Sequence, residues 1–480
     1  MHTKKRTKII ATIGPATEDP SMIKDLILEG VNVFRFNLKH NDLNWHVTNV
    51  NKVRQIAKDL GIFVGILLDL QGPDIRIGSV FPESLELKTG DKVIIGDSFK
   101  DTFKYPFIEL EKRFVDKIKR GQEIVIDDGN FVFKTLDDAK DGFITCVVEE
   151  SGGVLTHNKG IFFPNLDMNV PALSPKDKDN LKIAQQVQPE FLALSFVRHS
   201  QDILDLKKEM KRHNLEDSKI VAKIETKLAL KNIDGILEES QGIMVARGDL
   251  GVEIHLEAVP AIQKKLIRKA RKRTKFVIVA TQMLKSMVNN PYPTRAEVSD
   301  VANASYDLAD AVMLSEETAI GKYPLRAVKI MAKTLRFNEV ESLKSNRTAV
   351  PIFKTHEVTE AIVISANNIQ RDLEHVVTPK AFLVLTESGR TAKLLSALRP
   401  LIPIFSISQR DFVAQHLSLC WGVLPFSTKF KKTTDASVQA VISMLKEKGV
   451  IEPGDALIVI SGQNIGVPGQ TDSLRVLVTT

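Results

Sequence analysis

Short apolar runs of strand length recur along the chain, and longer segments lie between them. Such runs predict buried β-strands. Three of them precede residue 71 and five follow residue 190. Because all eight are uniformly apolar, as strands buried on both faces are, they predict a closed parallel (β/α)8 TIM barrel. The predicted strands are residues 7–13, 32–37, 63–70, 191–196, 220–225, 242–247, 276–281 and 311–315.

The segments between these runs carry apolar residues at spacings of three and four, which is typical of helices with one buried face. They are long enough to form the crossover connections that parallel strands need. The clearest are residues 44–60, 201–213, 227–239 and 257–274.

Residues 71–170, between the third and fourth predicted strands, follow a different pattern. Runs such as DKVIIGD and GFITCVVEE are separated by Gly and Asp turns, which predicts a small antiparallel β-barrel domain inserted into the larger barrel. It leaves from the carboxyl end of a strand, where barrel enzymes place their active sites. We therefore expect it to act as a lid.

A new pattern begins near residue 346. The helical segment EAIVISANNIQRDL is followed by strand-like runs and by glycine-containing turns that lead into helices, which predicts a separate C-terminal α/β domain. The chain then divides into a barrel domain (1–70 and 171–345), a lid domain (71–170) and a C-terminal domain (346–480).

The charge of the chain suits anionic small substrates. With 66 basic and 59 acidic residues, the formal net charge is +7. The densest basic stretch, residues 264–275, has two interpretations, a nucleic-acid patch or the solvated face of an amphipathic helix. Leu266, Ile267 and Ala270 keep helical spacing and no aromatic residue interrupts the stretch, which favours the helix.

The two cysteines, Cys146 and Cys420, lie far apart in the sequence. They predict buried thiols in a reducing compartment and neither a disulfide framework nor metal ligands. The basic N-terminus lacks the features of a secretory signal, and no apolar run approaches the ~20 residues that span a bilayer. We therefore expect a cytoplasmic protein.

Side chains suited to catalysis gather at the carboxyl ends of the predicted strands, where a barrel builds its active site. Alternation along the second strand puts Arg35, Asn37 and Lys39 on one face. The other strand-end residues are Asp69, Lys223, Glu225, Arg247, Asp249, Thr281 and Ser315.

The segments VAKIET and VARGDLG bring four charges to one barrel mouth. Glu225 and Asp249 would offer Mg²⁺ the oxygen ligands it takes, with water and substrate oxygens completing its shell. The alternative is a pair of structural salt bridges, Lys223 to Asp249 and Arg247 to Glu225. Four charges converging on one mouth favour the functional interpretation.

Gly248 precedes a potential helical turn whose free N–H groups could bind a carboxylate or phosphate. Mg²⁺, a lysine, an arginine and an anion-binding backbone are together suited to phosphoryl transfer, in which a protein positions groups and neutralises charge. The chain contains no P-loop motif and no protein-kinase glycine-rich loop with an HRD motif. The common nucleotide cradles are therefore excluded.

These residues resemble the pyruvate kinase family. The resemblance implies Mg²⁺-dependent transfer of a phosphoryl group from phosphoenolpyruvate to ADP, giving pyruvate and ATP in the last step of glycolysis. It also implies a homotetramer, usually with K⁺, and a C-terminal domain for regulation and oligomerisation. The motifs occur in the family's order across nearly the whole chain: TKIIATIGPAT, RFNLKH, LLDLQGPDIR, NKG, VAKIE, MVARGDLGVEI, ATQMLKSM, PTRAEVSDVANA, VMLSEETAIGKYP and LTESGRTA.

The resemblance implies a role for each matched residue. Lys223 would stabilise the phosphoryl group in transfer, and Glu225 and Asp249 would hold the Mg²⁺. The backbone of Gly248 and Asp249 would bind the substrate carboxylate, and Arg35 the phosphate. The remaining roles are proton delivery through water by Thr281, with Ser315 in the same network, and nucleotide binding by Arg76, Lys159, His40 and Pro15.

In the C-terminal domain, the turn TESGRT (386–391) resembles a loop that holds a phosphate of a sugar-phosphate activator. Glu387 opposes such binding, and the loop 461–472 has no basic residue or tryptophan for a second phosphate. Whether a sugar phosphate, a nucleotide or no effector binds stays open. The residues suited to the phosphate are Ser388, Gly389, Arg390 and Thr391.

Two of the four residues that the resemblance assigns to K⁺ are replaced here. Most members read NFSHG where this chain reads NLKHN, so Lys39 replaces a serine, and Leu70 replaces a threonine. Asn37 and Asp69 remain. We hypothesise that the Lys39 ammonium takes the place of the monovalent cation.

The alternative is that Lys39 turns to solvent and K⁺ still binds through Asn37, Asp69 and backbone oxygens. Asp74 resembles the acidic residue of K⁺-requiring members, so a need for K⁺ stays open.

Two other functions compete with the kinase. One is a catalytically silent barrel that senses phosphoenolpyruvate or a nucleotide, and the other is an aldolase on a similar metal barrel. An aldolase would have no use for a long lid that carries Lys159. The residues whose retention argues against a silent barrel are Lys223, Glu225, Asp249, Thr281, Arg35 and Arg76.

Overall fold

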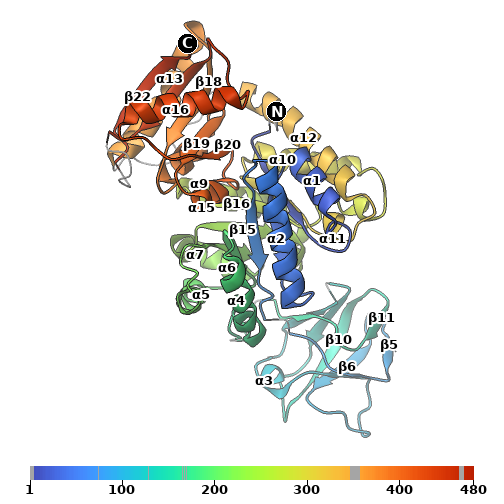
Figure 1. Cartoon of the computed structure of the whole chain (residues 1–480). Coiled ribbons are helices and arrows are strands. Elements are labelled where there is room, and N and C mark those ends of the chain that lie inside the picture. Colours follow the sequence, from blue (N-terminus) through green and yellow to red (C-terminus); the bar gives the residue numbers. More distant parts are fainter. Residues whose placement is uncertain are drawn as a thin grey trace.

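Three domains follow one another along the long axis of the molecule (Figure 1). The barrel lies in the middle, with the lid at one end and the C-terminal domain at the other. The computed structural model describes residues 5–73, 75–127, 129–164, 166, 168, 170–345, 357–463 and 470–480.

Eight parallel strands close into a barrel, which confirms the fold expected from the apolar runs. Seven of the strands carry buried residues at nearly every position, as a sheet covered on both faces requires. Around the ring the order is β1-β17-β16-β15-β14-β13-β3-β2. The strands are β1 (Lys8–Thr12), β2 (Val31–Asn37), β3 (Gly65–Asp69), β13 (Phe191–Leu194), β14 (Lys219–Ile224), β15 (Gly242–Ala246), β16 (Phe276–Ala280) and β17 (Ala311–Leu314).

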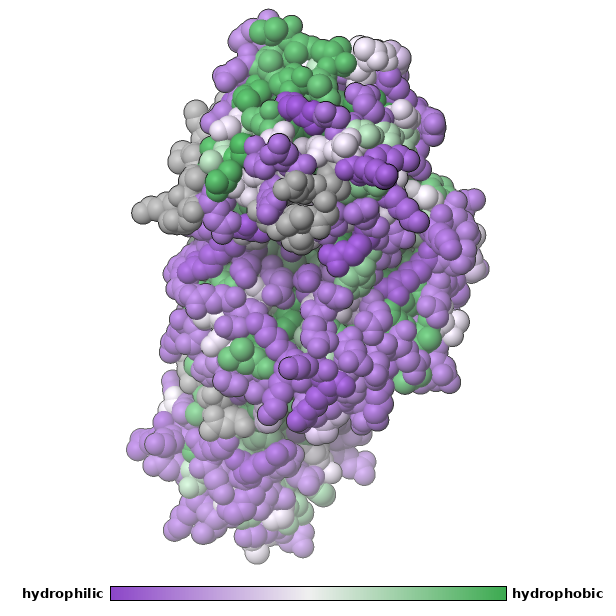
Figure 2. Space-filling model, turned by 60° about the vertical axis from the view of Figure 1, so that its left-hand side comes forward, coloured by the Kyte–Doolittle hydropathy of each residue, from purple (hydrophilic) through white to green (hydrophobic). Residues whose placement is uncertain are grey.

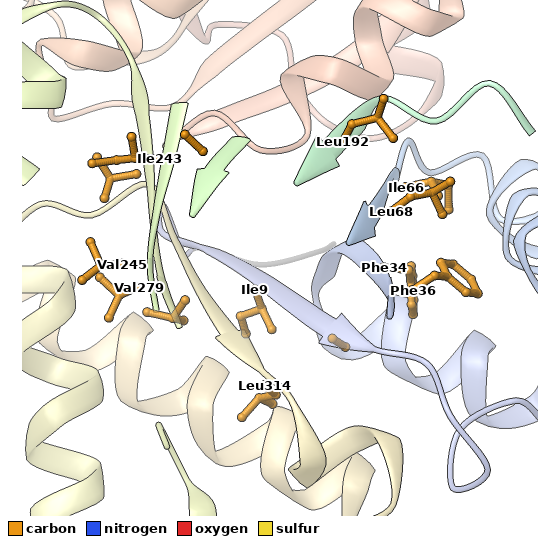
Figure 3. Close-up of a cluster of buried hydrophobic side chains, with 14 of the residues drawn as sticks. Ile9, Phe34, Phe36, Ile66, Leu68, Leu192, Ile243, Val245, Val279 and Leu314 are labelled. Atoms are coloured by element: carbon orange, nitrogen blue, oxygen red, sulfur yellow. The ribbon is translucent and has the colours of Figure 1, made fainter. Parts of the chain in front are cut away.

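Alternate residues of the barrel strands enter two different apolar clusters. One set, which includes Ile9 and Phe34, packs with the surrounding helices (Figure 3). The other set, which includes Ile10 and Val33, forms a separate cluster that also contains Leu419 of the C-terminal domain. Each fully buried side chain of this size contributes roughly 1.5–3 kcal/mol, so the barrel is held from both faces.

Helices cover the outside of the barrel near the predicted positions, with one exception. The predicted helix 227–239 is two helices, α6 and α7, because Asn232 between them is not helical and its side-chain amide donates to the carbonyl of Arg198 at 3.0 Å. The helices are α1 (Pro20–Glu29), α2 (Leu43–Asp59), α4 (Pro175–Val187), α5 (Ser200–Arg212), α6 (Lys227–Lys231), α7 (Ile233–Glu239), α8 (Arg247–Glu253), α9 (Val259–Lys272), α10 (Arg295–Tyr306), α11 (Glu316–Ala319) and α12 (Pro324–Ser345).

The basic stretch 264–275 lies largely in α9, as the amphipathic interpretation predicts. Leu266, Ile267 and Ala270 are buried against the barrel. On the polar face, Lys269 and Arg273 both pair with Asp234 of α7. This helix is therefore part of the barrel wall, with its charges on the outer side.

The lid has a sheet and an apolar core of its own. The sheet order is β12-β8-β9-β10-β6-β7-β4, and β5 pairs with β11 separately. The predicted antiparallel arrangement is confirmed except between β6 and β7, which run parallel. The elements are β4 (Val80–Phe81), β5 (Ser84–Glu86), β6 (Lys92–Gly96), β7 (Phe107–Glu109), α3 (Lys112–Val115), β8 (Glu123–Ile126), β9 (Phe131–Thr135), β10 (Phe143–Ser151), β11 (Val154–Thr156) and β12 (Ile161–Phe162).

One buried carboxylate fastens both connections between lid and barrel. Asp177 is fully buried in the first turn of α4. It accepts N–H hydrogen bonds from Gln71 at 2.8 Å and Gly72 at 3.0 Å, on the outgoing connection. On the returning connection it accepts from the N–H and the hydroxyl of Ser174, at 3.0 and 2.6 Å.

The C-terminal domain is a five-stranded sheet packed with helices, as expected, and its order is β20-β19-β18-β21-β22. Only β22 runs antiparallel to its neighbour. The strand β20 and the helices α15 and α16 were not predicted. The elements are α13 (Val358–Asp372), β18 (Pro379–Leu385), α14 (Arg390–Ala397), β19 (Ile404–Ser408), α15 (Asp411–Leu417), β20 (Val423–Ser427), α16 (Thr434–Glu447), β21 (Ala456–Ser461) and β22 (Ser473–Val478).

This domain packs against the amino ends of the barrel strands. Lys8, at the start of β1, donates to the carbonyl of Val423 at 2.5 Å. The ring of Phe191, at the start of β13, lies 5.8 Å from the ring of His416. The lid leaves from the opposite, carboxyl end of the strands. The carboxyl end of the barrel therefore faces the lid, and the amino end faces the C-terminal domain.

Three expectations fall outside the described residues. They are the start of the C-terminal domain at residue 346, residues 464–469 of the loop 461–472, and Asp74. Cys146 and Cys420 are both buried and free, as predicted. In the described part of the chain, no helix is both long enough and apolar enough to cross a membrane.

Replacing Asp177 by Asn should weaken the attachment of the lid. The amide keeps the shape but cannot accept all four hydrogen bonds, so we expect the free energy of unfolding to fall by about 1–3 kcal/mol. Denaturant titration measures this loss. Limited proteolysis at the lid connections should become faster.

The matched control is Asp179→Asn, two positions further along α4. Asp179 is exposed and pairs only with Lys182 on the surface, so its loss should cost less than about 0.5 kcal/mol. Equal losses in the two variants would contradict the role of Asp177 at the hinge.

Candidate active site

The carboxyl ends of the barrel strands hold a compact group of charged side chains. The Lys223 ammonium, at the end of β14, lies 3.0 Å from Glu225 and 3.4 Å from Asp69. Arg35, on β2, lies 2.7 Å from Asp69. Two cations and two carboxylates therefore form one network across β2, β3 and β14.

Asp69 is the centre of this network. Its carboxylate accepts from the Arg35 Nε at 2.7 Å, and a further Arg35 nitrogen donates to the hydroxyl of Thr12 at 3.0 Å. Burial by itself would raise the pKa of Asp69, but the charges of Lys223 and Arg35 outweigh it and lower the pKa below its ordinary value. Asp69 is therefore ionised at neutral pH and holds both cations at the mouth.

Lys223 is a fixed cation. It donates to the Ser195 hydroxyl at 2.7 Å, and that hydroxyl donates to the carbonyl of Leu70 at 2.7 Å. Burial would lower the pKa of Lys223, but Asp69 and Glu225 raise it above its ordinary value. The ammonium is therefore charged and oriented before any substrate arrives.

Glu225 is a carboxylate whose charged form is disfavoured chiefly by burial. It is buried, and it accepts from the N–H of Phe196 at 2.6 Å. Burial, opposed by Lys223 and reinforced by the charge of Asp249, raises the pKa of Glu225 to about 7. Because the Glu225 carboxylate is costly to ionise in the protein without a ligand, a bound cation would stabilise its charged form.

The salt bridges considered as a structural alternative do not form. Arg247 pairs with Asp300 at 2.7 Å and not with Glu225, and Lys223 forms its ion pairs with Asp69 and Glu225. Arg247 also donates to the carbonyl of Thr281 at 2.8 Å. Arg247 therefore supports the Thr281 turn at the mouth.

Thr281 and Gly248 meet across neighbouring strand ends. Gly248, in the first turn of α8, donates its N–H to the Thr281 hydroxyl at 2.8 Å, and that hydroxyl donates to the carbonyl of Ala280 at 2.6 Å. Thr281 has a φ of 69° and Gln282 a φ of 55°. Two consecutive non-glycine residues in the left-handed region are costly, and such strain is concentrated at functional sites.

Asp249 follows Gly248 in the first turn of α8 and is half-buried. Its charge acts on both Lys223 and Glu225, so it belongs to the same electrostatic group. Ser315 ends the next strand, β17, and its N–H donates to Glu317 at 2.8 Å. Glu317 also accepts from the N–H of Leu284 at 3.1 Å, which joins the turns that follow β16 and β17.

The loop after β2 carries the departures from the family. The side-chain oxygen of Asn37 accepts from the N–H of Lys39 at 3.2 Å, and the carbonyl of Lys39 accepts from Lys176 at 3.4 Å. Burial and then the charges of Lys39 and Arg35 lower the pKa of His40. The Leu70 side chain is buried in the apolar core, so position 70 has only its carbonyl to offer a cation.

The expected nucleotide residues lie apart from the charged network. Arg76 donates to the carbonyl of Asn158 at 2.7 Å, and Lys159 pairs with Asp127 at 2.9 Å, both within the lid. Pro15 and His40 are exposed on loops of the barrel. The lid contacts the mouth where the ring of Phe162 lies 6.3 Å from that of Phe196, the residue bonded to Glu225.

A divalent cation would have two protein carboxylates here. Among the described residues, no group of three or more His, Cys, Asp or Glu side chains is arranged to hold a metal ion. Glu225 and Asp249 are therefore a pair that leaves most of a coordination shell to water and substrate. This donor set is typical of Mg²⁺, which dehydrates reluctantly.

In the C-terminal domain, the turn 386–391 leads into α14 as predicted. Gly389 has a φ of 81° and donates to the Thr386 hydroxyl at 3.0 Å, and Thr391 shares a hydrogen bond with Thr471. Arg390 is the cation expected to hold a phosphate. In this structure it forms an ion pair with the carboxylate of Glu357 at 2.6 Å.

Several residues of the site were missed by sequence reasoning. Ser195 was missed because one hydroxyl in an apolar run carries no signal. Asp177 did have a sequence signal, because the segment SPKD before an apolar run is a capping-box pattern. The missed residues are Thr12, Asp177, Ser195, Asp300 and Glu317.

A TIM barrel with a fixed lysine, two neighbouring carboxylates and a hinged lid at its mouth defines a phosphotransferase-type site. The model of the pyruvate kinase barrel domain matches residues 4–328, and that of the pyruvate kinase alpha/beta domain matches residues 360–477. The chain therefore belongs to the pyruvate kinase family and is a phosphotransferase.

Individual relatives agree with the family models. Pyruvate kinase 2 of Synechocystis sp. is 40% identical, over 98% of this chain and 79% of the relative. The pyruvate kinase of Bacillus licheniformis is 37% identical, over 99% of this chain and 80% of the relative. That of Geobacillus stearothermophilus is 36% identical, over 98% and 80%. The kinase interpretation is confirmed, and nothing in the comparisons favours the silent sensor.

Replacing Glu225 by Gln should separate stability from metal binding. A raised carboxyl pKa means that the folded protein binds the proton more tightly than the unfolded chain, so stability is greatest below pH ~4.5 and is lost as the pH rises toward 7. The neutral amide should raise the free energy of unfolding at pH 7 without metal, by up to about 3 kcal/mol. Thermal unfolding with and without Mg²⁺ should show that the variant no longer responds to the metal.

Glu253→Gln is the control. Burial also raises the pKa of Glu253 to about 7, but its carboxylate accepts from the N–H of Lys227 and is not one of the two proposed ligands. This variant should keep the Mg²⁺ response. Loss of the response in both variants would indicate a general electrostatic effect.

Proposed function

We propose that the barrel mouth transfers the phosphoryl group of phosphoenolpyruvate to ADP and then protonates the enolate to pyruvate. The observation that carries this proposal is the buried Lys223 ammonium, held between Asp69 and Glu225 at the strand ends. Phosphoryl transfer needs fixed positive charge around the group that moves. Membership of the pyruvate kinase family supports the same reaction.

In the first step, the bond between the phosphorus and the enol oxygen breaks, and a bond from phosphorus to an ADP phosphate oxygen forms. Lys223 and Arg35 neutralise charge on the group in transfer. Asp69 holds both cations in place, so little reorganisation is needed during the reaction. The product that remains in the mouth is the enolate of pyruvate.

In the second step, the enolate carbon takes a proton. Thr281, held by the strained turn after β16, would guide this proton through water, with Ser315 in the same network. The backbone of Gly248 and Asp249 would bind the substrate carboxylate, which places the methylene carbon near Thr281. The hydrogen bond between Gly248 and Thr281 supports this arrangement, because it brings the two groups within 2.8 Å.

Glu225 and Asp249 would hold Mg²⁺. When bound, the ion supplies positive charge that polarises the substrate oxygens and offsets the charge of the carboxylates. The raised pKa of Glu225 supports this assignment.

The lid would bring the nucleotide phosphates to the mouth through Arg76 and Lys159, with His40 and Pro15 near the nucleoside. Lys159 is paired with Asp127 in this structure. ADP binding would therefore exchange one anionic partner of Lys159 for another, which is a low-cost change at a half-exposed site.

We further propose that Lys39 supplies the monovalent charge that the family usually takes from K⁺. Its place in the loop directly after β2, the strand that carries Arg35 and Asn37, supports this proposal. The Asn37 oxygen already accepts from the Lys39 N–H, and the Leu70 side chain lies in the core. Asn37 and Asp69 remain as ligands for K⁺ if the ion still binds.

For the whole protein we propose a cytoplasmic homotetramer. The edge strand β22 supports assembly through the C-terminal domain, because Val476 and Val478 are exposed on it and apolar side chains gather at that end of the molecule (Figure 2). A phosphate effector at Ser388, Gly389, Arg390 and Thr391 would have to displace Glu357 from Arg390.

Replacing Gly248 by Ala should abolish activity without harming the fold. A Cβ at this position would meet only Thr281, at 3.6 Å or more, which is ordinary contact. Alanine also suits a helix, so the stability should stay equal or rise by up to about 1 kcal/mol. The methyl group would displace the substrate carboxylate, and kcat/KM for phosphoenolpyruvate should fall about 100-fold or more.

Gly251→Ala, in the same helix, is the matched control. A Cβ there would meet Leu256 and Val259 at ordinary distances, so both stability and activity should be kept. Full activity of the Gly248→Ala enzyme would rule out this carboxylate site.

The cation requirement is tested by following phosphoenolpyruvate-dependent ATP formation from ADP with Mg²⁺, once with K⁺ and once with only a bulky organic cation. If Lys39 supplies the charge, the two rates should be equal. Lys39→Ser should then lose about 10²–10³-fold in rate without K⁺ and recover when K⁺ is added, because a fixed charge beside the transferred group is removed. Lys176→Ser, which removes a neighbouring charge, should stay independent of K⁺.

The outcomes of this assay are distinct. A strong K⁺ dependence of the unaltered protein would refute the role of Lys39 and leave the kinase intact. Inactivity in both cation solutions, with sugar phosphates or AMP also present, would refute the proposed reaction.

A further inference from the structure

A cavity lies where the C-terminal domain meets the amino ends of the barrel strands, on the opposite side of the barrel from the active site. It contains about 310 Å³ of empty space, part of it open to solvent. From the barrel it is lined by the end of α9 and the start of β16, and from the C-terminal domain by α14. The residues that matter here are Arg271, Lys275, Asp310, Lys393, Arg399 and Cys420.

The cavity has four cations and too little negative charge to balance them. Asp310 is the one carboxylate among the described lining residues. It is already engaged, because it lies 2.9 Å from Arg399 and accepts from the N–H of Val277 at 2.9 Å. Three positive side chains, Arg271, Lys275 and Lys393, therefore face the cavity without a carboxylate of their own.

The hydrogen-bond donors of these cations are only partly satisfied. Arg271 donates to the carbonyl of Ala397 at 3.3 Å, and Lys275 to that of Ser240 at 2.6 Å. Within the described part of the chain, the Lys393 ammonium has no hydrogen-bond or ion-pair partner. The Nε–H groups of Arg271 and Arg399 are buried and likewise have no partner there. The Arg399 side chain is only 3% exposed, so water cannot readily compensate it.

The electrostatics of the cavity agree with its geometry. Burial and then the charge of Arg399 lower the pKa of Arg271 to about 9. Burial and then the charge of Lys393 lower the pKa of Lys275. A protein that gathers like charges in a half-buried space keeps them at a cost, and an anion between them would remove that cost.

We propose that this cavity binds the phosphate group of a small anion and so ties α14 of the C-terminal domain to α9 and β16 of the barrel. Arg271, Lys275 and Lys393 contact the phosphate oxygens, and Arg399 with Asp310 forms the fixed wall. Guanidinium and ammonium groups from two domains suit a phosphate, which accepts several charge-assisted hydrogen bonds. Free phosphate or a phosphate monoester presents such oxygens, and we expect one of these as the ligand.

This site is separate from the turn 386–391. That turn precedes α14, and its Arg390 already pairs with Glu357. Lys393 follows one helical turn later and lines the cavity between the domains. The two positions can therefore be tested by separate substitutions in one helix.

The first experiment is calorimetric titration of the full-length protein with inorganic phosphate at constant ionic strength. Lys393→Gln should weaken phosphate binding at least about tenfold, because one charge-assisted contact is lost. Arg390→Gln and the exposed control Lys448→Gln should leave the affinity unchanged. Binding that survives Lys393→Gln but is lost in Arg390→Gln would place the phosphate at the turn 386–391 and overturn the proposal. Absence of phosphate binding by the unaltered protein would also overturn it.

A second variant tests the cavity without any ligand. Lys393→Glu places a carboxylate among the cations, so it should raise the melting temperature in phosphate-free buffer, and phosphate should raise it no further. A lower melting temperature than that of Lys393→Gln would show that the cavity needs no anion. To distinguish the sources, glycerol phosphate is titrated beside inorganic phosphate. Tighter binding of the ester identifies a phosphorylated metabolite, and tighter binding of phosphate identifies the free ion.

Discussion

The position of one ammonium group, that of Lys223, governs the arrangement at the barrel mouth. Asp69 and Glu225 are buried within reach of it, and neither carboxylate could stay there ionised without a cation. The closed ring of strands makes this arrangement possible, because it brings β3 and β14 to one rim although the whole lid separates them in the sequence. Fold and site thus depend on each other: the ring creates the pairing, and the pairing keeps charge within an otherwise apolar barrel.

The two ends of the barrel use charge differently. At the carboxyl end, Lys223 and Arg35 pair with Asp69 and Glu225, and burial together with the nearby charge of Asp249 makes Glu225 costly to ionise. At the amino end, against the C-terminal domain, cations outnumber the available carboxylate. The strand β16 spans this distance, since Phe276 lines the amino-end cavity and Thr281 follows its other end. Both arrangements lie where a small charged ligand can stabilise them.

Sequence reasoning succeeded where a residue's environment is local or periodic. The eight barrel strands and most helices were predicted because burial on both faces leaves continuous apolar runs. The strand β20 was missed because it is half-exposed and contains Pro425, which weakens a strand signal. The partners of charged side chains were harder to predict. Arg247 could not be assigned to Asp300 from the sequence, because only the fold brings α8 and α10 together. The assignment of Glu225 and Asp249 to a metal rests on residue type and position and stays a prediction, whereas the supporting Ser195 was not predicted.

The fastening of the lid at Asp177 has a consequence for how this domain could be gained or lost. Both connections between the barrel and the lid are held by the Asp177 carboxylate, and the lid carries its own apolar core. The barrel and the lid are therefore nearly independent modules. A short loop from Gln71 to Ser174 could bridge the gap without disturbing a barrel strand. The architecture therefore permits exchange of the whole lid between related barrels, with Asp177 retained as the attachment point in any such graft.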